Sequence, residues 1–98
     1  MLDNHSHSLS SKSIDHLYFI LSKIKSESDM ALLLQDLCTP QEIESMAQRL
    51  EVVKLLKQGY AYRNIHENCG ASLATITRIA RTLKYGVGGY QIIESIKE

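Results

Sequence analysis

The chain of 98 residues lacks tryptophan and contains one proline, one phenylalanine and two cysteines. With so few large aromatic side chains, a folded core has to be aliphatic. Cys38 and Cys69 stand apart, in no disulfide or metal-binding pattern, which is typical of reduced thiols in a cytoplasmic protein. No run of about 18 apolar residues is present, so we expect no membrane span. The first residues lack the basic and apolar regions of a secretory signal. The chain is also too short to hold a cofactor domain beside a substrate domain.

Positive and negative charges balance over the whole chain but not along it. Eleven Lys and Arg oppose eleven Asp and Glu. Residues 1–45 hold three basic and seven acidic residues, a net charge of −4, whereas residues 46–85 hold seven basic and two acidic residues, a net charge of +5. No acidic residue occurs from Asn68 to Ile93. A basic segment within a neutral protein is expected of a nucleic-acid-binding face, although an ordinary solvated helix surface would give the same pattern.

Apolar residues recur at helical spacing, and no segment shows the alternation of a strand, so we predict an all-α protein. Residues 1–12, rich in Ser and His, predict a flexible tail, and residues 13–98 predict one helical domain. His5, His7 and His16 could hold a metal, but no cysteine or carboxylate completes a site, and we predict neither a metal nor a cofactor. The predicted helices span residues 13–25, 29–37, 40–58, 62–69, 72–84 and 90–97.

Two of these helices carry further information. Residues 39–42, Thr-Pro-Gln-Glu, combine an N-cap hydroxyl, a proline at the first helical position and a glutamate three residues after the cap, which is a capping box. The inward side of the helix that it opens is predicted to contain Ile43, Met46, Leu50, Val53 and Leu56. The first helix is apolar over much of its circumference, so it needs two packing surfaces. We expect a second subunit to provide one of them.

The segment from residue 62 to residue 84 has the layout of a helix-turn-helix. Gly70 separates its two helices and permits a backbone turn that a β-carbon would strain. Ile65 and Cys69 of the first helix are predicted to meet Ile76 and Ile79 of the second. An ordinary α-hairpin is the alternative. The residues left facing outward on the second helix are Ser72, Ala74, Thr75, Thr77, Arg78 and Arg81.

Threonine, alanine and arginine side chains suit a major groove. Threonine bonds base edges or phosphates, methyl groups contact thymine, and arginine pairs with guanine or holds phosphate. Arg78 and Arg81 have no acidic residue three or four positions away, so no local ion pair occupies them. His66 departs from the general motif, which prefers a small residue at this position.

Several stretches of this sequence resemble the Trp-repressor superfamily, and most closely its TrpR-like YerC/YecD family of bacterial regulators. They are residues 37–42 (Leu-Cys-Thr-Pro-Gln-Glu), 48–50 (Gln-Arg-Leu), 70–78 (Gly-Ala-Ser-Leu-Ala-Thr-Ile-Thr-Arg), 83–86 (Leu-Lys-Tyr-Gly) and 89–90 (Gly-Tyr). The resemblance covers about residues 14–97. It implies an all-α, intertwined homodimer. The helix-turn-helix of each subunit, here called its reading head, would enter one of two successive major grooves.

The resemblance also assigns roles to individual positions. It places Arg63 and His66 of the first reading-head helix towards DNA, Lys84 on a phosphate, and a run of second-helix residues at the groove. Together with the outward arginines, the predicted DNA-binding residues are Arg63, His66, Ser72, Leu73, Ala74, Thr75, Thr77, Arg78, Arg81 and Lys84.

The co-repressor pocket of Trp repressors is where this sequence differs. Arg49 and Arg78 match the two arginines that hold the amino acid there, and Thr82 is close to the small hydroxyl residue. Ile79, however, stands where a glycine should be and fills the space of an indole. The possible pocket therefore comprises Thr39, Arg49, Arg78, Ile79 and Thr82, and we expect tryptophan not to bind it. Whether another effector binds stays open.

The sequence thus predicts a homodimeric, sequence-specific DNA-binding transcriptional regulator, and we expect a repressor. Its predicted partner is double-stranded DNA, and no membrane interaction is expected. An enzyme is not expected, because no nucleophile–base pair, carboxylate pair or phosphate loop is visible. The alternative is a small helical protein–protein interaction module that keeps the fold without reading DNA.

Overall fold

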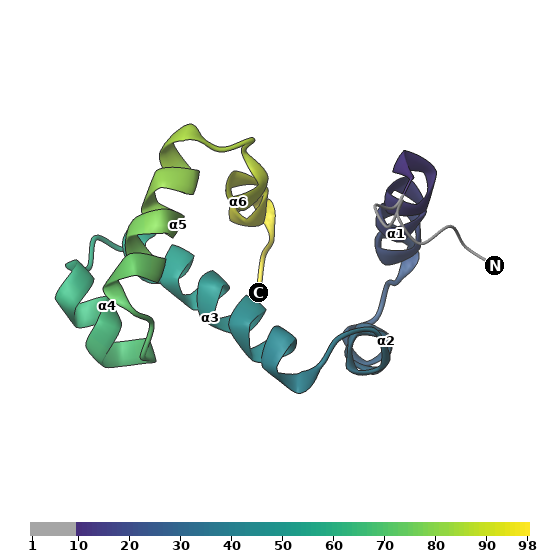
Figure 1. Cartoon of the computed structure of the whole chain (residues 1–98), viewed down its shortest axis with the longest axis horizontal. Coiled ribbons are helices and arrows are strands. Elements are labelled where there is room, and N and C mark those ends of the chain that lie inside the picture. The colour runs from purple at the N-terminus through teal and green to yellow at the C-terminus, as the bar shows by residue number, and fades with distance from the viewer. Residues whose placement is uncertain (1–9) are drawn as a thin grey trace, which may run out of the picture. The chain divides into compact units, whose positions relative to one another are not determined.

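The computed structural model describes residues 10–98 of the chain, and every regular element in that range is helical, which confirms the predicted all-α class. The chain divides into two compact units, one ending at Thr39 and one running from Pro40 to Glu98 (Figure 1). Most of the predicted tail, with His5 and His7, lies outside the described residues. None of the helices within residues 10–98 has the length and hydropathy needed to cross a bilayer.

The first unit contains two helices, α1 (Ser11–Lys23) and α2 (Glu27–Leu37). A serine hydroxyl caps each of them, because Ser10 accepts a hydrogen bond from the Ser13 amide and Ser26 accepts one from the Asp29 amide. These caps start both helices two residues earlier than the sequence pattern predicted. In the second cap, the hydroxyl oxygen of Ser26 lies 3.0 Å from the Asp29 nitrogen.

Neither helix of the first unit contains a buried residue. Tyr18 is 63% exposed, Phe19 55% and Leu32 65%. Such apolar side chains are normally covered, and helices of this length are marginal in water without tertiary packing. The wide apolar face predicted for the first helix is therefore present, and within one chain much of it stays exposed.

The second unit is built on α3 (Pro40–Lys57), which begins at the proline as the sequence predicted and ends before Gly59. Gly59 has a φ of +86° and takes the left-handed conformation expected after a helix end. Two shorter helices, α4 (Tyr62–Cys69) and α5 (Leu73–Tyr85), pack on α3 and on each other. The aliphatic core lies where the three helices meet and consists of Val52, Val53, Leu55, Ile65, Ala71, Ile76 and Ile79.

The predicted inward side of α3 is wrong in part. Val53 is buried and Leu56 packs against the core, but Leu50 is 51% exposed. The residues that join Val53 in the core are Val52 and Leu55. Neighbouring positions on a helix point about 100° apart, so α4 and α5 cover more than one side of the C-terminal half of α3. The sequence pattern of one apolar face on α3 does not predict packing on a second side of the helix.

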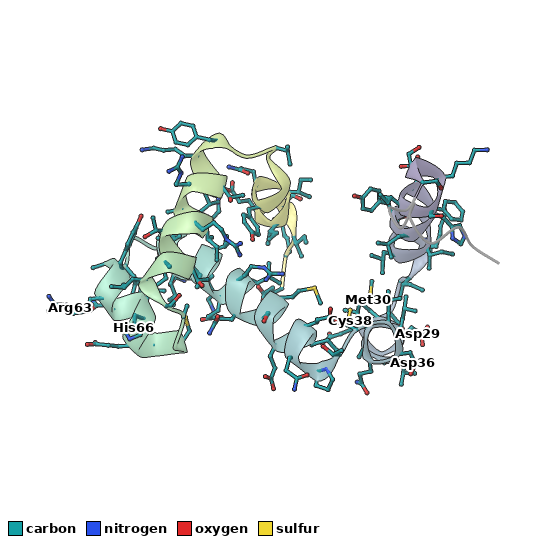
Figure 2. All side chains as sticks on the ribbon, viewed as in Figure 1. Asp29, Met30, Asp36, Cys38, Arg63 and His66 are labelled. Carbon is teal, nitrogen blue, oxygen red and sulfur yellow. The ribbon has the colours of Figure 1, made fainter. Side chains whose placement is uncertain are left out.

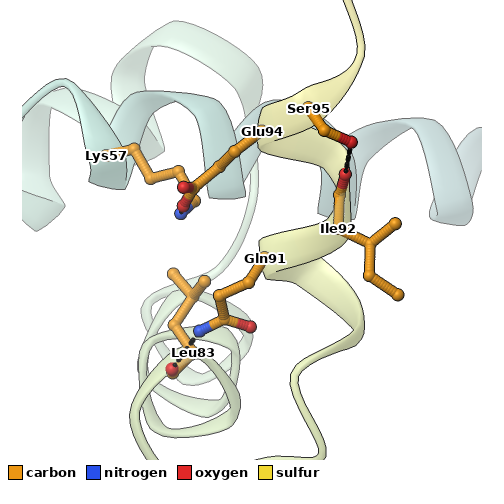
Figure 3. Close-up of polar contacts among 6 residues, drawn as sticks. All are labelled: Lys57, Leu83, Gln91, Ile92, Glu94 and Ser95. Atoms are coloured by element: carbon orange, nitrogen blue, oxygen red, sulfur yellow. Dashed lines mark hydrogen bonds and ion pairs between the residues drawn. The ribbon is translucent and has the colours of Figure 1, made fainter.

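The C-terminal segment forms a shorter helix than predicted. Helix α6 covers only Gly89–Ile92, and a 3₁₀ turn, η1, follows at Ile93–Ser95. Figure 3 shows how this segment is attached: the Gln91 side chain donates to the Leu83 carbonyl at 2.8 Å, and Lys57 of α3 pairs with Glu94. Tyr90 packs against the core from this segment. Tertiary attachment, rather than helix length, therefore holds the C-terminus in place.

Candidate nucleic-acid interface

The turn between α4 and α5 has the geometry that the sequence predicted for a helix-turn-helix. Gly70 adopts a φ of +77°, a conformation that strains residues with a β-carbon, and its amide donates to the His66 carbonyl at 2.9 Å. Gln48 of α3 donates its side-chain amide to the Cys69 carbonyl at 3.3 Å. The crossing of α4 and α5 is fixed below the turn by Ile65, Ile76 and Ile79, with Cys69 packed at the edge. The packing of Ile65 and Cys69 with Ile76 and Ile79 confirms the contact that the sequence predicted.

A histidine side chain closes the same turn. The Nδ1 atom of His66 lies 2.7 Å from the carbonyl oxygen of Ala71. The residue Ala71 is only 1% exposed. The hydrogen-bond ladder of α5 begins one residue later, at the Ser72 carbonyl, which accepts from Ile76. His66 thus supplies a donor to a carbonyl that the helix does not reach. This explains structurally how the motif holds a large residue where a small one is usual.

The N-terminus of α5 is organised by two hydroxyl residues. The Ser72 oxygen accepts from the Thr75 amide at 3.1 Å, and its hydroxyl donates to the Thr75 hydroxyl at 3.0 Å. The Thr75 oxygen therefore has one lone pair left to accept a further hydrogen bond. The hydrogen bond from Ser72 orients the Thr75 side chain. Leu73, Ala74 and Thr77 have exposed side chains around this pair. The first turn of α5 consequently offers methyl groups and hydroxyls in a fixed arrangement.

Four cationic side chains surround this surface. Arg63 extends outward from α4 (Figure 2), and Arg78, Arg81 and Lys84 follow along α5. All four are exposed, and within residues 10–98 none of them pairs with an acidic side chain. The predicted DNA-binding residues are thus brought together on two adjoining helices, and all of them are exposed except Thr75, which is half-buried.

A groove of about 450 Å³ runs beside the C-terminal half of α5. Its walls include Arg81 and Lys84 together with two aromatic residues, Tyr62 at the start of α4 and Tyr85 at the end of α5. Neither tyrosine was predicted to belong to the site, and the contact of Gln48 with the turn was not predicted either. The position of Tyr85 directly after Lys84 was the one available signal, whereas Gln48 is far from the turn in sequence.

Four of the five residues of the possible ligand pocket lie on α3 and α5. Arg49 on α3 is half-buried, whereas Arg78 and Thr82 on α5 are exposed, and the Thr82 hydroxyl donates to the Arg78 carbonyl at 3.1 Å. Ile79 is 2% exposed and belongs to the core. Thr39 is the last residue of the first unit. No cluster of possible metal ligands occurs in residues 10–98.

The fold and the arrangement of α4, the turn and α5 define a helix-turn-helix protein, and comparison with known proteins gives the family. A model of the family described as Trp repressor protein matches residues 12–95. The chain belongs to this Trp repressor family, as its sequence motifs predicted. Family membership points to a DNA-binding regulator.

Relatives and solved structures agree with this assignment. The uncharacterized protein YerC of Bacillus subtilis (strain 168) is 40% identical over 91 residues, covering 92% of this chain and 88% of YerC. A crystal structure of a putative Trp repressor from Staphylococcus aureus superposes with a TM-score of 0.81 at 38% identity, covering 86% of this chain and 84% of the other. A TrpR-like protein from Eubacterium eligens ATCC 27750 also gives 0.81, at 32% identity, covering 98% and 100%.

Proposed function

We propose that this protein is a homodimeric, sequence-specific transcriptional regulator that binds double-stranded DNA and does not use tryptophan. Repression is its simplest mode, because a dimer that covers two successive major grooves blocks other proteins from the same site. Its place of action would be the cytoplasm of a bacterium, as the bacterial relatives suggest. The residues proposed to bind DNA are the ten exposed or half-buried positions of α4 and α5 described above.

One observation carries this proposal: the outer face of α5 is rich in hydroxyls, methyl groups and unpaired cations. No acidic residue occurs from Asn68 to Ile93. Arg78, Arg81 and Lys84 have no ion-pair partner within the described residues, so they are available to phosphates or guanine. A stabilising role in a salt-bridged helix surface would have needed acidic neighbours at helical spacing.

A homodimer is supported by the apolar residues that one chain leaves exposed. Ile14, Leu17, Tyr18 and Phe19 on α1 are all at least 39% exposed. A second copy would cover them and would pair two reading heads at a fixed separation. Half-sites one helical turn apart, at about 10 base pairs, would then be bound together.

Substitution of Thr75 tests the DNA-binding role with little risk to the fold. Thr75 is the third residue after the Ser72 cap, and a glutamate or glutamine at that position of a helix completes a capping box. Thr75→Glu therefore preserves α5 but sets a carboxylate against phosphate. We expect it to weaken binding to a duplex selected from a random pool by at least about a hundredfold, as measured by fluorescence anisotropy.

Thr75→Gln is the matched control, because it supports the same helix without the charge. It should bind clearly more tightly than Thr75→Glu, and circular dichroism should show both variants folded. Wild-type affinity in the glutamate variant would refute the proposed DNA-binding face.

A second candidate function is an interaction module that has lost DNA binding. It is favoured by the same exposed apolar residues of the first unit, since these could serve a different protein instead of a second copy. Selection from random DNA separates the two functions. A module of this kind would enrich no sequence, and its affinity for DNA would not respond to Thr75→Glu.

A further inference from the structure

His66 contributes two different things to the reading head, one from each ring nitrogen. Its Nδ1 atom faces the Ala71 carbonyl at 2.7 Å. A carbonyl oxygen only accepts, so Nδ1 has to carry a hydrogen. That requirement holds both in the neutral ring and in the imidazolium. The contact that closes the turn therefore persists whichever charge the ring carries.

The other nitrogen, Nε2, changes its character with protonation. With Nδ1 fixed as the donor, the neutral ring presents a lone pair at Nε2, which only accepts. The imidazolium presents an N–H and a positive charge at the same atom. Histidine is the side chain that ordinarily makes this change between about pH 5 and pH 8. A phosphate oxygen repels the first form and binds the second.

No charged side chain of the described residues forms an ion pair with the His66 ring. His66 is exposed, and no acidic side chain pairs with it within residues 10–98. Its own helix carries Arg63 and Glu67, and residues 70–77 of the turn and α5 carry no charge before Arg78. On α3, which packs against α4, the charged residues flanking Gln48 in sequence are Glu44, Arg49 and Glu51, and none forms a hydrogen bond or ion pair with the ring.

We propose that His66 is both a positioning residue for α5 and a proton-linked contact to the DNA backbone. Binding takes up a proton from solvent at Nε2, so DNA affinity rises as the pH falls, while Nδ1 keeps the turn closed throughout. This inference rests on the proposed DNA-binding function. It goes further by naming the atom through which pH reaches the regulator.

The test uses two substitutions that separate the two nitrogens. His66→Asn keeps an amide donor near the position of Nδ1 but has no group that gains a proton. His66→Ala removes both. At fixed protein concentration, His66→Ala should lower Tm by about 4 °C, corresponding to the loss of one hydrogen bond, and His66→Asn should restore most of this shift.

DNA affinity is measured on the full chain by fluorescence anisotropy. The probe is a labelled duplex of about 30 base pairs, selected by the wild-type protein from a random pool and long enough for two half-sites. The wild-type protein should bind about tenfold more tightly at about pH 6 than at about pH 8, at constant ionic strength. His66→Asn should change less than about twofold over the same range. His16→Asn, an exposed histidine on α1, is the matched control and should behave like the wild type.

The outcomes are distinct. The inference is overturned by a wild-type protein whose affinity does not respond to pH, or by a His66→Asn variant that keeps the full response. Restoration of Tm by asparagine together with loss of the pH response supports both roles. If no variant binds or selects DNA at any pH, the proposed function fails, and this inference fails with it.

Discussion

Replacement of Ile79 tests the core of the second unit, at the position where the resemblance to Trp repressors implies a glycine. Ile79 is 2% exposed and lies in the core with Ile65 and Ile76, which are both fully buried. Ile79→Ala removes three carbons. At about 0.8 kcal/mol per carbon, the transfer term is about 2.4 kcal/mol, and the cavity left behind raises the total towards about 2–5 kcal/mol.

That loss is large for a domain of this size, whose entire stability is expected to be about 5–15 kcal/mol. Urea unfolding followed by circular dichroism at one fixed protein concentration measures it, because a dimer makes apparent stability concentration-dependent. Leu73→Ala is the matched control. Leu73 lies on the same helix but is 55% exposed, so its removal should cost less than about 0.5 kcal/mol. If Ile79→Ala costs no more than Leu73→Ala, Ile79 is not a well-packed core residue and would not exclude a ligand.

Three further outcomes follow from the same structure. Sedimentation equilibrium at micromolar concentration should give twice the chain mass of 11.1 kDa, because α1 and α2 bury no residue within one chain; a stable monomer would remove the paired half-sites. Arg81→Ala should weaken binding to all DNA sequences alike, because one phosphate contact per subunit is lost. The slope of log affinity against log salt concentration should then decrease in magnitude by about 0.9 per subunit. An unchanged slope argues against that contact. Calorimetric titration with L-tryptophan should show no saturable binding below about 100 µM, equivalent to about 5.5 kcal/mol, because we expect the buried Ile79 to exclude an indole. Tight binding that also strengthens DNA affinity would contradict this.

The sequence predicted the elements of the second unit well where the signal is local. Pro40 starts α3, and Gly70 adopts a positive φ in the turn. Each of these residues acts on the backbone within a few positions of itself, so no knowledge of the tertiary structure is needed. The exposure of the α5 face follows in the same way, because a helix with Ile76 and Ile79 turned inward has to turn Thr77, Arg78 and Arg81 outward.

The errors arise where distant segments decide the result. Leu50 fits an apolar stripe on α3, yet α4 and α5 cover Val52 and Leu55 and leave Leu50 half exposed. The C-terminal helix ends at Ile92, earlier than the sequence predicted, in a segment whose Gln91 and Glu94 side chains contact the Leu83 carbonyl and Lys57. The bond between His66 and Ala71 could not be foreseen either, since it depends on the rotamer of His66 and on the path of the chain after Gly70.

The two units also differ in what they bury. The second unit encloses a core of seven buried residues where three helices meet, although Leu50, Ile92 and Ile96 at its surface are more than half exposed. In the first unit, helices of 13 and 11 residues bury no side chain while Phe19 and Leu32 are more than half exposed. Isolated helices this short are marginal in water. If the protein is the proposed dimer, association of the two subunits also stabilises α1 and α2. The pairing of the reading heads then depends on the same apolar residues that hold these helices in place.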